Sequence, residues 1–415
     1  MKQGSIDITA QLLAYALAEP PEDVRAVMRL SLLDWAACGM AGHRDGAFDA
    51  WAATLDTDGP ATRFDGRGGT MAEAALVNGT LSHALDYDDT HFAHIGHPSV
   101  AVIPAALAMA QMQGVPLNDM VDAAVVGAEA SVATGLWLGR GHYQVGFHQT
   151  ATAGAFGATI AAARLLCLDG DKMRHALGLC STMASGLKSQ FGTMGKPLNA
   201  GLAARTGVEA TLWAQAGMTA SPDGLAGALG FGETHHGARA KVPFAWRMGS
   251  VSHKFHACCH GLHAALETVR DVPLRDATRV EVHTHPRWMT VCNQAAPDTG
   301  LGAKFSYAHV LAMTAHGMDT GKISAFTDAC AQNPRLVSWR GRVTVSPVDD
   351  LTEMQARVIV DGAERFHDLD TPLPFETRAN RIHEKARALV GARADEIAQA
   401  IKDDDLPAFA QLLTS

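Results

Sequence analysis

Apolar residues recur at helical spacing through the first two thirds of the chain, and this pattern constrains the fold more than any other feature. Within each segment they fall three and four residues apart, as on one face of an α-helix. Several segments are apolar on most faces, so we expect central helices surrounded by other helices. The segments are Ile8–Ala18, Pro21–Met40, Thr70–Ala84, Val100–Gln113, Leu117–Leu138, Thr150–Leu168, Asp171–Leu187, Pro197–Gly217 and Gly261–Val269.

Near Pro273 the pattern changes to alternating apolar and polar residues. Alternation of this kind predicts strands, and the last of them runs into Asp361-Gly362, a hairpin-turn signal. The strands are Arg279–Thr284, Arg340–Val345 and Gln355–Asp361, with helices predicted over Lys304–His316 and Thr320–Ala331. Helical spacing returns after Pro374. We therefore predict a mainly α fold: residues 1–270 form an all-α domain, residues 271–370 a smaller inserted α+β domain, and residues 371–415 return to the helical domain.

Composition and charge argue against several classes of protein. The 34 Lys and Arg against 43 Asp and Glu give a net charge of −9 without any basic run, so we expect no nucleic-acid partner. The longest stretch free of charge and histidine, Ser99–Asn118, contains Pro104 and Pro116 and predicts a buried helix rather than a membrane span. The N-terminus lacks a signal-peptide pattern. Seven cysteines without a CxxC pair favour reduced thiols and a cytoplasmic protein.

The first motif that could carry chemistry is the histidine- and aspartate-rich segment Ser82–Pro98. Imidazoles and carboxylates are common ligands of zinc and iron, so a metal site is one interpretation. However, the last three histidines are spaced three apart in a loop-like stretch, unlike the i, i+4 pairs of helical metal sites. The spacing favours a metal-free acid/base loop, and a purely structural loop is the alternative. The residues are His83, His91, His94, His97, Asp86, Asp88 and Asp89.

The second motif is Gly141–Thr150, which leads into an uncharged helix. His148 and Thr150 would lie at the start of that helix, where backbone N–H groups and the positive end of the helix dipole favour an anion such as a carboxylate. The dipole would also lower the pKa of an imidazole and keep it neutral. The alternative is an ordinary helix start with a buried histidine.

The third motif places Lys196 between Gly195 and Pro197, just before a Gly/Ala-rich helix. Little there could solvate the ammonium group, so it could hold a carboxylate or act as an acid. A surface lysine with its stem on apolar residues is the alternative. The fourth motif, His253–His263, brings His260 and His263 to one helix face, with Cys258 and Cys259 beside them.

In their order along the chain, these motifs resemble the MmgE/PrpD family. His83-Ala-Leu-Asp-Tyr-Asp-Asp-Thr90 with His97-Pro-Ser99 is similar to the signature of that family. The resemblance covers essentially the whole chain, and the ordered set is specific although each piece alone is weak. It continues in Gly146-Phe-His148, Lys196-Pro-Leu198, Gly224–Phe231, Lys254 with Cys258-Cys259 and His263, and Ala303-Lys-Phe-Ser306.

The resemblance implies a large helical domain built from both chain ends and an α+β lid inserted near the C-terminal third. It implies a site without metal or cofactor at the junction of the domains, commonly in a homodimer. Carried over by motif, the expected catalytic residues are His148, Lys196, His97 and Asp86. Contacts to substrate are expected from Lys196, Thr150, His260, His263 and Tyr143.

The activity that the resemblance implies is proton abstraction next to a carboxylate of a small di- or tricarboxylate. Loss of water would follow, as in a 2-methylcitrate dehydratase, with His148 or His97 as base and Asp86 orienting a histidine. An epimerase of an iminodisuccinate-type acid and a decarboxylase of a cis-aconitate-type acid are the alternatives, and a carboxylate-binding scaffold is the non-enzymatic one. Two departures leave the substrate open: His309 stands where the family often has Tyr, and Asn199 where it often has His.

Overall fold

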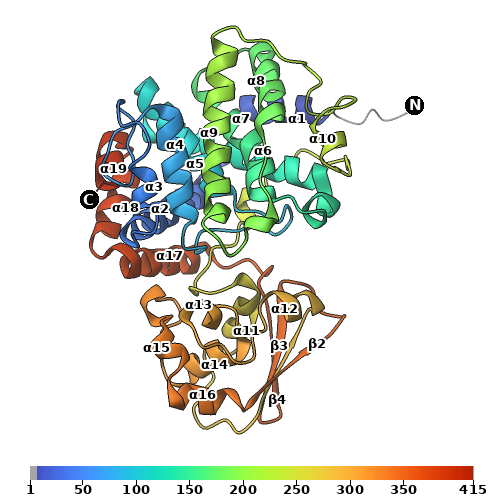
Figure 1. Cartoon of the computed structure of the whole chain (residues 1–415), viewed down its shortest axis with the longest axis vertical. Coiled ribbons are helices and arrows are strands. Elements are labelled where there is room, and N and C mark those ends of the chain that lie inside the picture. Colours follow the sequence, from blue (N-terminus) through green and yellow to red (C-terminus); the bar gives the residue numbers. More distant parts are fainter. Residues whose placement is uncertain (1–6, 415) are drawn as a thin grey trace. The chain divides into compact units, whose positions relative to one another are not determined.

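The protein, seen in a computed structural model that describes residues 7–414, divides into two units (Figure 1). The first runs to His253 and resumes at Val390, and the second comprises Lys254–Leu389. The structure is mainly α with one small sheet, as predicted.

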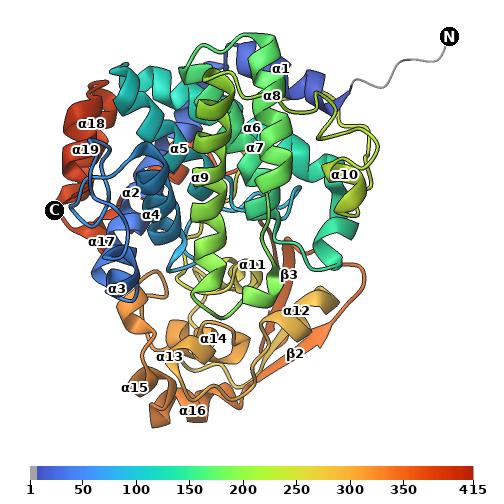
Figure 2. The same ribbon diagram turned by 45° about the horizontal axis from the view of Figure 1, so that its top comes forward.

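The first unit is helical. It contains α1 (Ile8–Leu17), α2 (Glu22–Arg44), α3 (Asp49–Ala52), α4 (Met71–His83), α5 (Pro98–Gln113), α6 (Leu117–Gln144), α7 (Gln149–Leu165), α8 (Gly170–Met183), α9 (Gly195–Gln215), α10 (Phe231–Thr234), α18 (Arg393–Lys402) and α19 (Leu406–Leu412), with the 3₁₀ turns η1 (Lys188–Gln190) and η2 (Met248–Ser250). Helices α5 and α7 are buried along most of their length, and α4, α6 and α9 pack around them (Figure 2).

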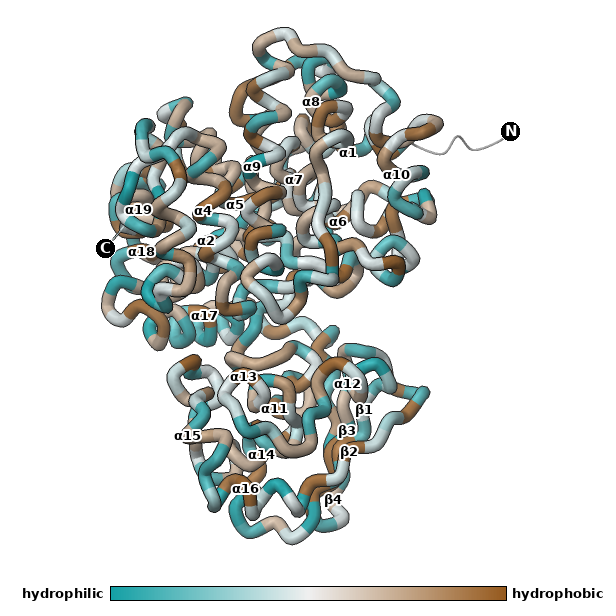
Figure 3. Tube along the Cα trace, viewed as in Figure 1, coloured by the Kyte–Doolittle hydropathy of each residue, from teal (hydrophilic) through white to brown (hydrophobic). Residues whose placement is uncertain are grey.

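Glycines let these central helices approach one another closely. A Cβ atom on Gly79 of α4 would lie 2.8 Å from the Cα of Gly201 on α9, and one on Gly157 of α7 would lie 2.5 Å from the carbonyl oxygen of Gly127 on α6. No side chain fits at such distances, so the Gly/Ala-rich sequence is what allows this packing. The hydropathy of the trace shows the apolar residues concentrated on these inner helices (Figure 3).

One helix, α6, is long and apolar enough to cross a membrane, yet 89% of its most apolar window is buried inside the protein. A central helix of a globular unit has this property, since apolar residues on all faces can be covered by neighbouring helices. The segment singled out in the sequence, Ser99–Asn118, is likewise mostly buried, as α5 and the start of α6.

The second unit is built on a four-stranded sheet with the order β2-β1-β3-β4. The strands are β1 (Val280–Thr284), β2 (Val343–Pro347), β3 (Gln355–Val360) and β4 (Ala363–Asp368). β1 pairs parallel with β2 and antiparallel with β3, and β3 pairs antiparallel with β4. Its other elements are η3 (His260–Leu262), α11 (His263–Thr268), α12 (Pro286–Val291), α13 (Gly300–Ala303), α14 (Tyr307–Ala315), η4 (Ile323–Ala325), α15 (Asp328–Ala331), α16 (Pro334–Arg340) and α17 (Phe375–Val390).

Three local predictions differ from the structure. The helix expected over Thr320–Ala331 is reduced to η4 and α15. The strand expected from Arg340 begins at Val343, because Arg340 ends α16. β4 was not predicted, since most of its residues are exposed and it lacks a buried face to alternate against. The chain passes from one unit to the other after His253 and after Leu389, and α11 packs on β3 and β4 within the second unit. The predicted boundaries at residues 270 and 370 stay a prediction.

Candidate active site

Three helices of the first unit begin close together, and each brings a residue predicted for the site. His97 is the N-cap residue of α5, His148 is the N-cap residue of α7, and Lys196 is the second residue of α9. The three helices pack against one another, and the backbone N–H of His97 donates to Thr150 Oγ1 at 3.1 Å. The helix dipole places partial positive charge at such helix starts, so the arrangement suits an anion.

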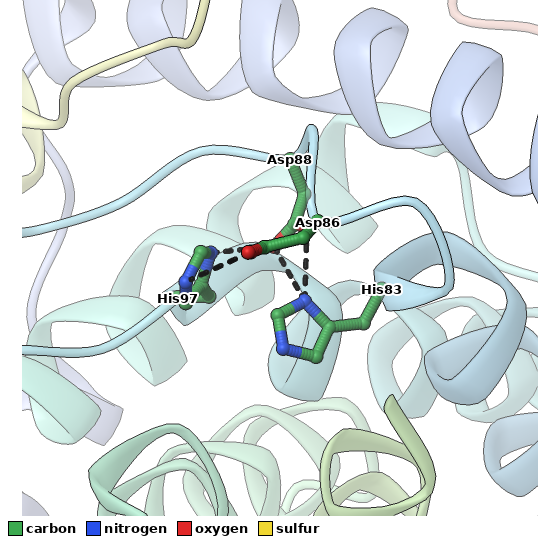
Figure 4. Close-up of side chains that lie close together, drawn as sticks. All are labelled: His83, Asp86, Asp88 and His97. Carbon is green, nitrogen blue, oxygen red and sulfur yellow. Dashed lines mark hydrogen bonds and ion pairs between the residues drawn. The ribbon is translucent and has the colours of Figure 1, made fainter. Parts of the chain in front are cut away.

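Asp86 lies in the loop between α4 and α5 and connects two of these residues. Its Oδ1 is 2.8 Å from Lys196 Nζ. The same oxygen is 3.7 Å from His97 Nε2 (Figure 4). The backbone of Asp86 has a φ of 51°, an uncommon left-handed conformation for a residue with a side chain. The ion pair therefore depends on a backbone conformation that the surrounding loop must hold in place.

Asp88 is the buried carboxylate that joins two histidines. Its oxygens lie 2.9 and 3.1 Å from His83 Nδ1, and Oδ2 lies 2.8 Å from His97 Nδ1 (Figure 4). Burial alone would raise the pKa of Asp88, but the two imidazoles lower it well below its usual range. Burial lowers the pKa of His83 to about 4 despite Asp88. At neutral pH the pair is therefore a carboxylate that accepts from a neutral imidazole.

The neighbouring Asp89 holds the start of α5. Its carboxylate accepts hydrogen bonds from both the backbone N–H and the hydroxyl of Ser99, in the first turn of that helix. His97, although the N-cap residue, makes no side-chain cap bond, so Asp89 supplies the cap. Burial and the nearby carboxylates of Asp34 and Asp88 raise the pKa of Asp89 to about 7.

Asn199 orients the ring of His148 through a hydrogen bond to Nδ1. The amide Nδ2 of Asn199 lies 3.3 Å from His148 Nδ1 and also 3.3 Å from the carbonyl oxygen of Leu187. The carbonyl can only accept, so the amide nitrogen faces it and donates to the imidazole as well. Burial, followed by the charges of His83 and Lys196, lowers the pKa of His148 well below its usual range. The predicted direction is the same, but burial rather than the helix dipole is its largest cause.

Phe191 forms an apolar wall beside these polar groups. Its ring meets that of His148 edge to face, with centroids 5.0 Å apart, and Lys196 Nζ lies 5.6 Å from its centroid. Phe191 was not among the expected catalytic or substrate-contacting residues. It follows η1 in a segment whose irregular backbone gives no periodic signal.

The other two histidines of the first motif lie apart from this cluster. His91 Nε2 donates to the carbonyl oxygen of Arg247, just before η2, at 3.0 Å. His94 is buried with its ring against Gly96 and Gly135. Their spacing of three residues therefore does not bring them to one centre with His97.

Two of the expected substrate contacts in this unit have other partners. Thr150 is buried and its hydroxyl accepts from the backbone of His97, so it positions that residue. Tyr143 is half-buried and its ring lies under Lys188, with the ammonium nitrogen 3.8 Å from the ring centroid. Substrate contact by these two residues stays a prediction.

His260 and His263 belong to the second unit, where their rings are 4.5 Å apart. His263 Nε2 lies 3.4 Å from the carbonyl oxygen of Cys258, and burial lowers the pKa of His263 well below its usual range. Their predicted contact with substrate also stays a prediction.

The chemistry of the donor set fits proton transfer better than metal binding. His83, Asp86, Asp88 and His97 place one ligand atom each within 4.8 Å of one another. However, Asp86 is paired with the ammonium group of Lys196, and Asp88 accepts from His83 at hydrogen-bond distance. A cation would have to displace both partners and tolerate the lysine charge. What the arrangement can do directly is bind an anion and move protons between imidazoles and carboxylates.

Sequence reasoning placed Lys196, His97, His148 and Asp86 at this site, and the structure brings these four together. It expected Asp86 to orient a histidine, whereas the shorter contacts to His83 and His97 come from Asp88. His83, Asp88 and Asn199 were not among the expected site residues. The first two are in the same motif, which was the available signal.

Comparisons with known proteins identify the family of the chain. Residues 7–242 match the family model of the MmgE/PrpD N-terminal domain, and residues 256–404 match that of the C-terminal domain. The chain is 26% identical to a cis-aconitate decarboxylase of Aspergillus terreus over 91% of its length and 87% of the relative. It is 30% identical to a cis-aconitate decarboxylase-like protein of Aspergillus oryzae over 65% of the chain and 63% of the relative, and 29% identical to the human cis-aconitate decarboxylase over 48% and 44%.

Proposed function

Since the chain belongs to the MmgE/PrpD family, we propose that it is a lyase that removes a proton next to a carboxylate of a small di- or tricarboxylate and expels water, as a 2-methylcitrate dehydratase does. The single observation that carries this proposal is the grouping of Lys196, His97, His148 and the Asp88 pair at the starts of three helices. Because the relatives are cis-aconitate decarboxylases, a carboxylate-acting lyase is the class that they support.

Binding of the substrate carboxylates follows from charge. Lys196 supplies a full positive charge, and the helix dipoles add partial positive charge at the starts of α5, α7 and α9, although the first N–H groups of α5 and α9 are already bonded within the protein. Asp86 holds the ammonium group until a substrate carboxylate replaces it. Such preorganised positive charge also stabilises the dianion that forms when the α proton leaves, and this is where most of the rate enhancement would arise.

Elimination of water needs a proton donor and a proton acceptor at the same time, and the histidines of the cluster can supply both. His148 accepts from Asn199 at Nδ1, so its neutral ring carries the proton on Nε2 and can donate it. His97 lies between Asp88 and Asp86, with Nδ1 2.8 Å from Asp88 Oδ2 and Nε2 3.7 Å from Asp86 Oδ1. The proton acceptor is a neutral imidazole of the same cluster. Protonation of a leaving hydroxyl by the acid would complete the reaction.

Decarboxylation of a cis-aconitate-type acid is the second candidate, and the named activity of the relatives favours it. That reaction needs an acid that protonates carbon while CO2 leaves, but no base for an α proton. The same lysine and helix starts would bind the acid. The products distinguish the two reactions.

The test is an assay of the full chain with 2-methylcitrate, cis-aconitate and iminodisuccinate, with products identified by NMR. We expect an unsaturated tricarboxylate and water from 2-methylcitrate. Release of CO2 from cis-aconitate would establish the second candidate instead, and inversion of iminodisuccinate would establish an epimerase. A protein that binds these acids and converts none would overturn the proposal.

We further propose that the reaction needs no metal and that the enzyme is a cytoplasmic homodimer, as the family resemblance implies. Treatment with excess EDTA followed by gel filtration should leave kcat unchanged. A loss that Zn²⁺ or Fe²⁺ restores would contradict metal independence. The mass in solution, measured by light scattering, tests the homodimer.

A further inference from the structure

His83 ends α4 and has no assigned role, yet it is one of the most completely buried residues of the cluster, with 1% of its surface exposed. Its Nδ1 faces both oxygens of Asp88. Its Nε2 has no hydrogen-bond partner among residues 7–414. Buried polar atoms are nearly always paired, so an unpaired one inside an active-site cluster needs an explanation.

The protonation state of His83 follows from its partner. The pKa of Asp88 is far below its usual range, so Asp88 is a carboxylate that can only accept, and Nδ1 of His83 must carry the hydrogen. The pKa of His83 is about 4, so the ring is neutral and Nε2 bears a lone pair. Figure 4 shows this second nitrogen on the side of the ring away from Asp86 and Asp88.

The ring of His83 lies beside the groups that bind and protonate substrate. It is nearly parallel to the ring of His148, with centroids 6.0 Å apart and 20° between the planes. The charge of Lys196 also acts on His83 and lowers its pKa. His148 presents an N–H and His83 presents a lone pair, so the two stacked rings have opposite hydrogen-bonding capacity.

His94 shows that an unpaired buried nitrogen alone does not indicate a site. Both of its nitrogens also lack partners among the described residues. However, no carboxylate orients its ring, and the backbones of Gly96 and Gly135 pack against it. His83 differs because Asp88 fixes its tautomer and because His148 and Lys196 lie next to it.

From this geometry we infer that His83 is a catalytic residue whose Nε2 accepts the α proton of the substrate, with Asp88 as the positioning residue behind it. This inference rests on the proposed function. The proton moves from the substrate carbon to Nε2 and gives an imidazolium that hydrogen-bonds to Asp88, while the electron pair of the broken C–H bond moves into the enediolate of the neighbouring carboxylate. A carboxylate bound at Lys196 would offset the charge that lowers the pKa of His83 and so make the base stronger.

Two substitutions test the roles of Nδ1 and Nε2 of His83 separately. In His83→Asn the amide nitrogen can replace Nδ1 as donor to Asp88, but nothing replaces Nε2. We expect this variant to keep its Tm within a few degrees and to lose about 10²-fold or more in kcat/KM on the acid that the wild type converts. His83→Gln places an amide near Nε2 but no base, and we expect a similar loss. His175→Asn on α8 is the control and should keep its activity. Full activity of His83→Asn would overturn the inference.

A second measurement is independent of turnover. Nitrogen-15 NMR of wild-type protein with labelled histidine, assigned with the variants that fold and by through-bond correlation, reports which ring nitrogen carries hydrogen. We expect a protonated Nδ1 and a bare Nε2 for His83 at pH 7, and the reverse for His148. A hydrogen on Nε2 of His83 would overturn the inference even if the lyase activity is confirmed. An absence of turnover with the expected tautomers would instead count against the proposed function.

Discussion

Two histidine–carboxylate groups, one in each unit, differ in whether a ring nitrogen is left without a hydrogen bond. The first group is the active-site cluster around His83 and Asp88, and the second is His256 with Glu267 and Arg381. In the second unit, His256 bonds Thr320 Oγ1 at 2.7 Å through Nδ1 and Glu267 at 3.0 Å through Nε2, and Glu267 also binds Arg381. In the first unit, His83 uses one nitrogen on Asp88 and leaves the other unpaired beside His148. Each pairs a histidine with a carboxylate, but His256 has both ring nitrogens bonded, whereas His83 keeps one that can accept from a substrate.

The comparison shows that the number of histidines does not locate the chemistry. The chain has 20 of them, and many serve packing or structural hydrogen bonds, as His94 and His256 do. What marks the first group is a lysine, three helix starts and histidines that are oriented by a carboxylate but not saturated. The predictions below test this distinction.

The largest effect is expected from Lys196→Ala. Removal of the ammonium group leaves the substrate carboxylate and the developing dianion without their full positive charge, so kcat/KM should fall on the order of 10³-fold. Steady-state kinetics on the acid that the wild type converts measures the loss. Lys402→Ala, an exposed lysine on α18, is the matched control and should stay within twofold. If Lys196→Ala remained fully active, the first group would not be the active site.

The opposite behaviour is expected from Glu267→Gln in the second group. It leaves His256 and Arg381 without their buried anion and should lower the free energy of unfolding by about 3 kcal/mol. The kcat of the folded protein should change less than tenfold. Urea unfolding and kinetics on the same preparation check both parts, with the exposed Glu384→Gln as control. A large loss of kcat at unchanged stability would remove the contrast between the two groups.

The pH dependence of stability follows from the same pairings. The pKa of Glu267 is lowered from its usual 4.5, so its contribution is complete above pH 4.5 and is lost as the pH falls through its folded value. The pKa values of His83 and His91 are about 4 in the folded protein, against about 6.5 when unfolded. The unfolded chain therefore binds more protons below pH 6.5, and stability should fall from there towards pH 4. Urea midpoints between pH 7 and 4 measure this, and a flat profile would contradict neutral buried histidines.

Within the first group, the two adjacent aspartates should differ. Asp88→Asn removes the carboxylate that orients His83 and His97 and should cost about 10²-fold in kcat. Asp89→Asn imitates the protonated form of a group whose pKa is about 7, and it keeps an acceptor for Ser99, so we expect less than a tenfold loss. Equal losses in the two variants would show that Asp88 acts only by holding the loop.

The smallest effect is expected from His263→Gln and His260→Gln. If these residues contact substrate, as the family resemblance implies, KM should rise by about tenfold with little change in kcat, because uniform binding is lost. An unchanged KM in both variants would leave the second unit without a role in binding.

Most helices of the first unit could be predicted from sequence because their apolar periodicity is strong and their ends carry signals such as Pro98 and Asp169. The same signals placed His148 and Lys196 at helix starts, whereas His97 was predicted in a loop and is the N-cap residue of α5. Which of Asp86 and Asp88 would contact the histidines more closely could not be predicted, because it depends on the left-handed backbone at Asp86. Likewise, the separation of His94 from His97 depends on Gly135, which lies on a different helix.

The most direct test of the account is the movement of hydrogen at the carbon next to a carboxylate. The EDTA-treated enzyme is incubated in D2O with the acid that it converts, and NMR follows deuterium at that carbon in substrate and product. We predict exchange with solvent at this position for the wild type and its loss in His83→Asn and Lys196→Ala. Conversion at full rate without any transfer at this carbon, or exchange that persists in both variants, would contradict the assignment of the first histidine group as the catalytic site.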